Sequence, residues 1–202
     1  MENILEAYGI DMTIRIKQVD ATSIKQYSEH LKNLKTDDKF SRFGHTVSDH
    51  TIDSLMLRIV YNPEEHHLWQ AHDDGEVYGW GHLAKDGEAW ELAVSVNSHK
   101  QQNGIGNKLI TEMLEWAKVH HVHEVYMHCI EDNKIIQHLA AKHNLKTKER
   151  SMGERTSAIE LPEPSIFEVS KQRWIEHNAL LEEYQSLRKR MTDLWFGSMN
   201  GR

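Results

Sequence analysis

Cysteine is almost absent from this sequence. Cys129 is the single one among 202 residues, so the chain cannot form an internal disulfide, and a reducing compartment suits it. No apolar run approaches the roughly 18 residues that a membrane-spanning helix requires. The first residues lack a basic segment followed by an apolar one, which is the pattern of a secretory signal peptide. We therefore expect a cytoplasmic protein with no membrane partner.

Positive charge is also scarce. Lys and Arg number 24 against 31 Asp and Glu, which gives a formal net charge of −7. Proteins that bind nucleic acid without sequence preference are usually basic, because the phosphate backbone supplies most of their affinity. We therefore expect no nucleic-acid partner.

Proline occurs three times, and two of the three, Pro162 and Pro164, stand close together. The length suits one domain with an extension, and we expect a domain over residues 1–161 and a charged C-terminal helical extension over residues 162–202. Apolar residues in the extension recur at alternating intervals of four and three: Leu180, Tyr184, Leu187, Met191 and Leu194. This seam fits either packing against a folded domain or a homodimer.

Periodicity and turn residues predict the elements of the domain. Strands are expected over residues 12–18, 67–72, 76–84, 88–96 and 122–130, with two short ones around Gly153; helices are expected over residues 21–34, 48–60, 109–117 and 134–143. Residues 36–47 are mostly polar, and we predict a loop there. Two consecutive hairpins followed by alternating helices and strands indicate an α+β fold with a mixed sheet.

Residues 101–109, Gln-Gln-Asn-Gly-Ile-Gly-Asn-Lys-Leu, lie between a predicted strand and a predicted helix. Gly104 and Gly106 remove side chains where a backbone must approach a ligand closely. The free N–H groups and the dipole at the start of a helix favour an anion. This stretch predicts a site for the pyrophosphate of a cofactor.

The spacing excludes two common phosphate-binding loops. A Walker loop needs two glycines five apart followed by Lys and Ser or Thr, whereas here the glycines are two apart. A dinucleotide-binding fingerprint needs a third glycine, and Leu109 occupies that position.

The remaining pattern, Gln101-x-x-Gly104-x-Gly106, resembles the acyl-CoA-binding signature Q/R-x-x-G-x-G/A of the GNAT superfamily of N-acetyltransferases. The preceding strand and the Asn133 that opens the next helix strengthen the resemblance, which covers roughly residues 12–161. Further similar positions are Lys142, Asn144 and Leu145, and the segments 41–43 and 139–142 are more similar to bacterial GNAT domains of the protein-lysine acetyltransferase type.

The resemblance implies a GNAT-like, mostly antiparallel central sheet flanked by helices, and acetyl-CoA as co-substrate. Backbone groups of Val94 and Val96 would pair with the pantetheine arm, and the side chain of Asn133 would hydrogen-bond it. The pyrophosphate would bind at the loop and helix start formed by Gln101, Gln102, Asn103, Gly104, Ile105, Gly106 and Asn107. No metal is expected to take part.

Glu91 is the candidate general base, because a carboxylate beside the thioester can accept the amine proton directly or through water. A solvated or merely positioning carboxylate is the alternative. The family's usual proton donor is a tyrosine whose place is taken here by Ala140. Tyr126, His128 and His138 are nearby in sequence and could replace it as proton donors, although structural roles explain them more simply. Cys129 could form an acyl-enzyme, but its apolar strand favours a packing role.

The acceptor is expected to be a primary amine, either of a small molecule or of a protein lysine. Residues 36–58 and 151–154 would contact it. Four acids could attract it, although solvated surface positions explain them more simply: Asp37, Asp38, Asp49 and Asp53. The fifteen histidines raise the possibility of zinc, but helix-end and surface positions explain them more simply. Two other functions stay open, namely an acyl-CoA sensor of weak activity and an interaction protein that acts through its C-terminal helix.

Overall fold

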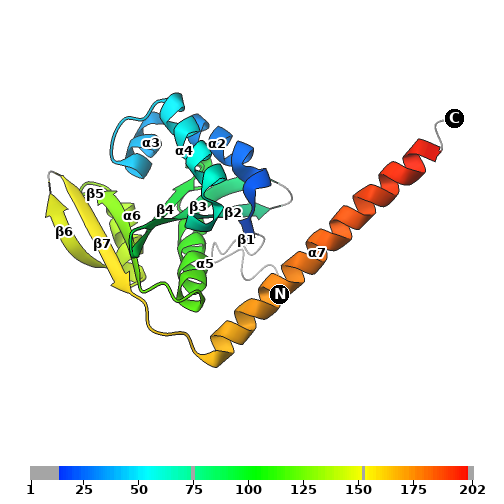
Figure 1. Cartoon of the computed structure of the whole chain (residues 1–202). Helices are drawn as coiled ribbons and strands as arrows, with labels where there is room; N and C mark the ends of the chain where they lie inside the picture. The colour runs from blue at the N-terminus through cyan, green and yellow to red at the C-terminus, as the bar shows by residue number, and fades with distance from the viewer. Residues whose placement is uncertain (1–13, 74–75, 152, 200–202) are drawn as a thin grey trace, which may run out of the picture. The chain divides into compact units, whose positions relative to one another are not determined.

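The computed structural model describes residues 14–73, 76–151 and 153–199 (Figure 1). It divides into two compact units, residues Met1–Pro162 and Glu163–Arg202. The start of the first predicted strand, and residues 74–75 between the predicted strands 67–72 and 76–84, lie outside the described residues.

A seven-stranded sheet forms the first unit, in the order β1-β2-β3-β4-β5-β7-β6. The strands are β1 (Arg15–Val19), β2 (His66–Asp73), β3 (Glu76–Asp86), β4 (Ala89–Val96), β5 (Glu124–Ile130), β6 (Lys146–Ser151) and β7 (Glu154–Glu160). Every neighbouring pair is antiparallel except β4 and β5, which run parallel. This confirms the predicted α+β class and the mixed, mostly antiparallel sheet.

Helices cover both faces of this sheet (Figure 1). The α-helices of the unit are α2 (Ile24–Asn33), α3 (Thr36–Phe43), α4 (Asp49–Tyr61), α5 (Ile105–Val119) and α6 (Lys134–Lys142). One apolar core joins α5 to the sheet around Leu83, Leu92 and Val125. A second core joins α2 and α4 to the opposite face around Trp80.

Gly81 of β3 leaves room for a side chain of α5. A Cβ added at Gly81 would lie 2.7 Å from Sδ of Met113 in α5. Ordinary carbon–sulfur contacts are longer than this, so the flexible end of Met113 would have to move. The absence of a side chain at Gly81 thus lets Met113 pack between the sheet and α5, whose first turn carries the predicted phosphate site.

The prediction of a loop over residues 36–47 is wrong for its first part, because residues Thr36–Phe43 form α3. The helix is polar and none of its residues is buried, so it has no apolar stripe to reveal it. Two helix signals are nevertheless present in the sequence. Asp37 and Asp38 stand in the first turn, and Gly44 ends the helix in the left-handed region at φ 75°, with its N–H bonded to the carbonyl of Phe40.

The second unit is one long helix, α7 (Ile166–Met199). It lies within residues 162–202, for which a helical extension is expected. Tyr184, Leu187 and Met191 of the predicted seam are exposed in the structure, while the side chains of Leu180 and Leu194 lie outside the description. Among the described helices none is both long enough and apolar enough to cross a membrane.

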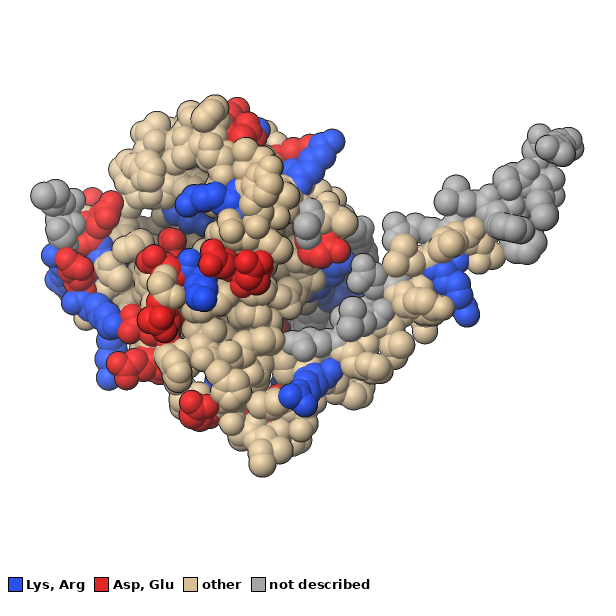
Figure 2. Space-filling view, viewed as in Figure 1, with Lys and Arg blue, Asp and Glu red and all other residues tan. Residues whose placement is uncertain are grey.

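The surface carries charges of both signs. Figure 2 shows one face of the molecule, on which Asp and Glu side chains are interspersed with Lys and Arg over the first unit. This mixture follows from the composition of 24 basic and 31 acidic residues.

Candidate functional site

The parallel strands β4 and β5 separate partway along their length. They pair only from Ala89 to Glu91 on β4, opposite Glu124 to Tyr126 on β5. Beyond Glu91, the strand β4 continues to Val96 and pairs with β3 alone. The backbone of residues 92–96 is thus left without a strand partner on its β5 side, which is an edge to which an extended ligand can add.

Residues 97–104 connect the end of β4 to the start of α5, and we call this segment the glycine turn. Gly104 is the N-cap residue and adopts the left-handed conformation, with φ 75° and ψ 3°. Gln102 also has a positive φ, 67°, which is uncommon for a residue with a side chain. The N–H groups of the first helical turn have no acceptor within the helix, and they carry the positive end of its dipole.

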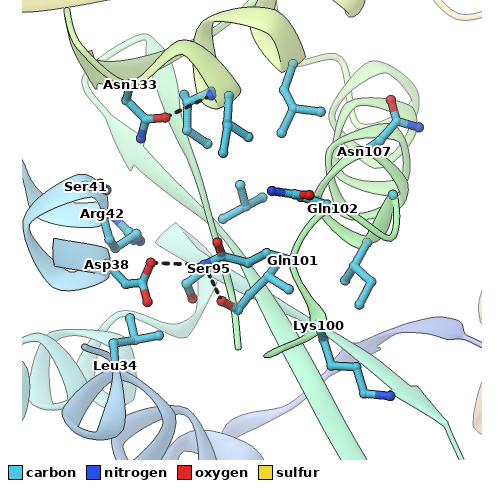
Figure 3. A pocket seen from close by; sticks show the side chains of 18 residues that line it. Leu34, Asp38, Ser41, Arg42, Ser95, Lys100, Gln101, Gln102, Asn107 and Asn133 are labelled. Atoms are coloured by element: carbon cyan, nitrogen blue, oxygen red, sulfur yellow. Dashed lines mark hydrogen bonds between the residues drawn. The ribbon is translucent and has the colours of Figure 1, made fainter. Parts of the chain in front are cut away.

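A cavity of about 220 Å³ lies between the unpaired part of β4 and the glycine turn (Figure 3). Its lining comes from α2, α3, β4, the glycine turn, α5 and α6. The residues are Leu34, Asp38, Ser41, Arg42, Val94, Ser95, Val96, Lys100, Gln101, Gln102, Gly104, Ile105, Gly106, Asn107, Asn133, Ile135, Ile136 and Leu139.

The structure brings most of the predicted cofactor-binding residues to this one cavity. Of those predicted, only Asn103 is not part of the lining; it is exposed and donates to the carbonyl of Lys100 at 3.4 Å. The Asn133 oxygen caps α6 by accepting from the N–H of Ile136 at 3.1 Å. Glu91, the predicted base, also lies outside the lining.

Asp38 joins α3 to the glycine turn. Its two carboxylate oxygens accept hydrogen bonds from Ser98 at 2.6 Å and from Gln101 at 3.0 Å. Gln101 also donates to the carbonyl of Val96 at 3.2 Å. The Gln101 of the predicted signature therefore holds the turn against the end of β4 and against α3, and Asp38 is already engaged by protein donors.

The other acids that could have attracted an amine are arranged differently. Asp53 forms an ion pair with Lys32 at 2.5 Å, and Asp49 lies 4.0 Å from Lys39. Asp37 is exposed. None of these three lines the cavity.

A polar group adjoins β4 on the side of α2 and α3. The ring of His30 lies 2.8 Å from the Ser95 hydroxyl, and burial lowers the pKa of His30 to about 4, so this imidazole is neutral at pH 7. Burial is the largest influence on the pKa of His30, of His82 and of the Tyr27 phenol, and the charge of Arg42 lowers the pKa of all three. Arg42 itself lines the cavity.

Glu91 lies on the same face of β4 as Ser95, four residues earlier, which is about 13 Å along an extended strand. Its register partner on β5 is Tyr126. The Tyr126 hydroxyl donates to Asp86 at 2.7 Å, and burial, this bond and the Glu91 charge all raise the pKa of Tyr126. The Tyr126 hydroxyl therefore holds its proton more tightly and is already bonded to a carboxylate, which makes it a poor proton donor near pH 7.

Ala140, which the resemblance places where the family usually has a tyrosine, is 2% exposed and part of the core. The side chains of His138 and His128 are exposed, and His128 lies 3.0 Å from the Thr156 hydroxyl. Neither histidine lines the cavity.

Cys129 is buried, donates to the carbonyl of Arg155 at 3.4 Å, and has its pKa raised by burial. A thiol in this state is a poor nucleophile.

The interpretation of the histidines needs one correction. His120 does cap the end of α5, where its ring stacks on Trp116 with 3.9 Å between centroids. His66 and His67, however, are half-buried, and burial lowers the pKa of His67 to about 4. Over the described ranges, no three His, Cys, Asp or Glu side chains gather as metal ligands would.

The range 36–58 that the sequence assigns to acceptor contact includes Ser41 and Arg42 of the lining, but neither was named as a site residue, and the hydroxyl of Ser95 was missed. The helix signals around residues 36–44 could have indicated α3. No local pattern marks Arg42 as a cavity residue, since that depends on how α3 lies against β4.

An unpaired strand edge, next to a helix start that favours anions, defines a site for an extended ligand that ends in phosphate groups. The family model described as "Acetyltransferase (GNAT) family" matches residues 29–144, which is more than half of the sequence. The chain belongs to this family, as the resemblance in the sequence predicts.

Solved structures support the same fold. The GNAT domain of PAT from S. lividans is 12% identical, with a TM-score of 0.63 over 73% of this chain and 90% of that one. The paia N-acetyltransferase from Thermoplasma acidophilum, in complex with coenzyme A, is 17% identical with a TM-score of 0.58 over 74% and 99%. Spermidine N-acetyltransferase from Vibrio cholerae, in complex with CoA and spermine, is 12% identical with a TM-score of 0.59 over 74% and 96%. No curated protein sequence matches the chain.

Proposed function

We propose that this protein is an acetyl-CoA-dependent N-acetyltransferase, which moves acetyl from acetyl-CoA to a primary amine by direct attack in a ternary complex. The family supports acetyl transfer as the reaction, and coenzyme A in two of the similar structures supports the donor. The observation that carries the proposal is the coincidence, in one cavity, of the unpaired edge of β4 and the first turn of α5.

In this proposal the pantetheine arm lies along β4 beside Val94 and Val96, as an added strand between β4 and β5. The diphosphate binds at the N–H groups from Gln102 to Asn107, and Asn133 closes the opposite wall on α6. An amide of β4 polarises the thioester carbonyl.

The amine nitrogen attacks the thioester carbon, the carbon–sulfur bond breaks, and CoA leaves as a thiolate. The proton lost by the amine passes to Glu91. Because Glu91 stands outside the cavity lining, we propose that water carries this proton. Ala140 supplies no proton donor, so the thiolate takes its proton from solvent.

The test of the donor site is Gly104→Val, with Gly87→Val as its control. Both glycines have positive φ, 75° and 61°, and neither has any atom within 4 Å of an added Cβ. The two variants therefore suffer similar backbone strain, on the order of 1–2 kcal/mol, but only Gly104 lines the cavity. We expect Gly104→Val to abolish binding of acetyl-CoA, measured by calorimetry, and Gly87→Val to leave it intact.

Equal affinity for acetyl-CoA in the wild type and in Gly104→Val, with both folded by circular dichroism, would refute the donor site. Transfer itself is tested by release of the CoA thiol when acetyl-CoA meets a panel of primary amines.

A second candidate function is an acyl-CoA sensor of weak activity. It is favoured by the replacement of the usual tyrosine by the buried Ala140. Tight binding of acetyl-CoA without thiol release over the whole panel would support this candidate against the enzyme.

We also propose that residues 1–161 carry the transferase and that residues 162–202 are a separate extension, able to form a homodimer. The exposed Tyr184, Leu187 and Met191 on α7 support an interaction role for the extension.

A further inference from the structure

Arg42 is a cation in the cavity wall that the proposed transfer reaction does not use. The residue lines the cavity, and its Nε is buried and has no hydrogen-bond partner. Among the described residues, no carboxylate lies within ion-pair distance of it. Arginine stays charged at all physiological pH values; Arg42 is half-buried, and an N–H donor that is buried without an acceptor is costly. This feature calls for an anion from outside the protein.

The neighbours of Arg42 hold it in place without neutralising it. Its guanidinium lies 5.0 Å from the centre of the Phe43 ring and close enough to Tyr27 to hydrogen-bond the phenol. His30 beside it is neutral at pH 7, because burial lowers its pKa to about 4. A guanidinium so placed presents a fixed fork of N–H donors, which matches a carboxylate.

The cofactor's own phosphates belong to the other side of the cavity. Figure 3 shows Arg42 and Ser41 on the α3 side, with Gln102 and Asn107 of the phosphate site across the cavity from them. Between these two sides runs β4, where the thioester would lie. An anion at Arg42 is therefore on the side of the thioester from which an acceptor approaches.

The charges of the lining disfavour a polycationic acceptor. Arg42 and Lys100 are basic, and Asp38 is the single acid among the lining residues. Both oxygens of Asp38 already accept hydrogen bonds, from Ser98 and Gln101. An amine with several positive charges would meet an excess of positive charge here, although the protein as a whole has a net charge of −7.

We propose that Arg42 binds a carboxylate of the acceptor, so that the substrate is a small amine that also carries a carboxylate, such as an amino acid. This inference rests on the proposed acetyl transfer and names its substrate class. Arg42 would bind the acceptor in the same orientation for each turnover, with its amine directed at the thioester along β4.

The experiment compares L-amino acids with their α-carboxamides, together with spermidine, at saturating acetyl-CoA. Release of the CoA thiol gives kcat/KM for each acceptor. We expect the wild type to prefer the best amino acid over its amide by about 10- to 100-fold, the range of a charge-assisted pair of hydrogen bonds. In Arg42→Gln this preference should fall to near one, because kcat/KM falls more for the amino acid than for its amide, while the acetyl-CoA affinity stays unchanged. Arg42→Lys should keep part of it.

The matched control is Arg155→Gln. Arg155 also has a buried Nε without a partner, but it does not line the cavity. Its variant should keep the wild-type preference, and melting temperatures check that all variants fold.

An equal kcat/KM for the amino acids and their carboxamides, or a higher kcat/KM for spermidine, would overturn the inference. The proposed acetyl transfer would then still stand. A loss of acetyl-CoA affinity in Arg42→Gln would also overturn it, because Arg42 would then bind a cofactor phosphate. If no amine causes release of the CoA thiol, the proposed function fails. Calorimetry of the same pairs of amino acid and carboxamide, with and without CoA, then tests whether Arg42 binds a carboxylate. Carboxylate-selective binding that Arg42→Gln removes would uphold the inference, and its absence would end it.

Discussion

Single residues decide the chemistry available in this cavity, and Glu91 is the clearest example. Glu91 and Tyr126 form the last pair of residues before β4 and β5 separate. Burial and, to a smaller extent, the Glu91 charge raise the pKa of the buried Tyr27 and of the half-buried Tyr126, so the carboxylate acts on groups of both α2 and β5. A water chain from this position to the cavity is the route that a general base would need.

We expect Glu91→Gln to lower kcat about 100-fold, the low end of the range for a positioned base, and to leave the acetyl-CoA affinity unchanged. The loss should be greatest at low pH, where less free amine is present and help with deprotonation matters more. Steady-state rates from pH 6 to pH 9 measure this. Glu88→Gln, in the exposed turn before β4, is the matched control. An unchanged kcat in Glu91→Gln would leave deprotonation to solvent alone.

At the scale of elements, α3 links the two halves of the proposed site. Through Asp38 it holds the glycine turn, and through Arg42 it forms the opposite wall. The end of the helix also approaches the β6–β7 hairpin, since a Cβ added at Gly44 would lie 3.1 Å from Glu154. A polar helix with no buried residue thus takes its position from hydrogen bonds and contacts at its ends.

Asp38→Ala should loosen the glycine turn, because Ser98 and Gln101 lose their shared acceptor. We expect the free energy of unfolding in urea to fall by about 1–3 kcal/mol and the acetyl-CoA affinity to fall with it. Asp37→Ala is the control, since Asp37 is the neighbouring, exposed residue of the same helix. If both variants bound acetyl-CoA like the wild type, α3 would have no part in shaping the donor site.

Most elements were predictable because their signals are local. Ser48 caps α4 by accepting from the N–H of Thr51, and Asn133 caps α6 in the same way, as their positions before apolar stripes indicate. The one helix missed, α3, lacks such a stripe.

At the scale of the whole molecule, several histidines are buried in the neutral form. Burial lowers the pKa of His30 and of His67 to about 4, and lowers that of His82 well below its usual value. In the unfolded chain these groups titrate near pH 6.5. Between pH 6.5 and pH 4 the unfolded state therefore binds more protons than the folded state, and stability falls as the pH falls.

For His30 alone this linkage removes about 2 kcal/mol of unfolding free energy between pH 7 and pH 5. Urea denaturation at both pH values should show a smaller loss in His30→Gln than in the wild type. His45→Gln, at an exposed position, should behave like the wild type. Parallel losses in all three proteins would mean that His30 is not buried neutral.

The family and the donor site follow from the sequence, because a glycine turn between a strand and a helix is a local pattern in a continuous stretch. The signature at residues 101–106 predicts the family that the match over residues 29–144 shows. Its backbone geometry needs only the residues themselves, as the left-handed Gly104 illustrates.

The sequence indicates a broad range, residues 36–58, for the acceptor side, but only the tertiary structure decided which side chains meet there. Arg42, Ser95 and His30 are far apart in the sequence and meet only because α2 and α3 pack against β4. Whether a surface-type residue such as arginine ends in solvent or in a cavity wall depends on contacts between distant segments, which no local period encodes. The strand separation that opens the cavity is equally non-local, since it depends on where β5 stops pairing with β4.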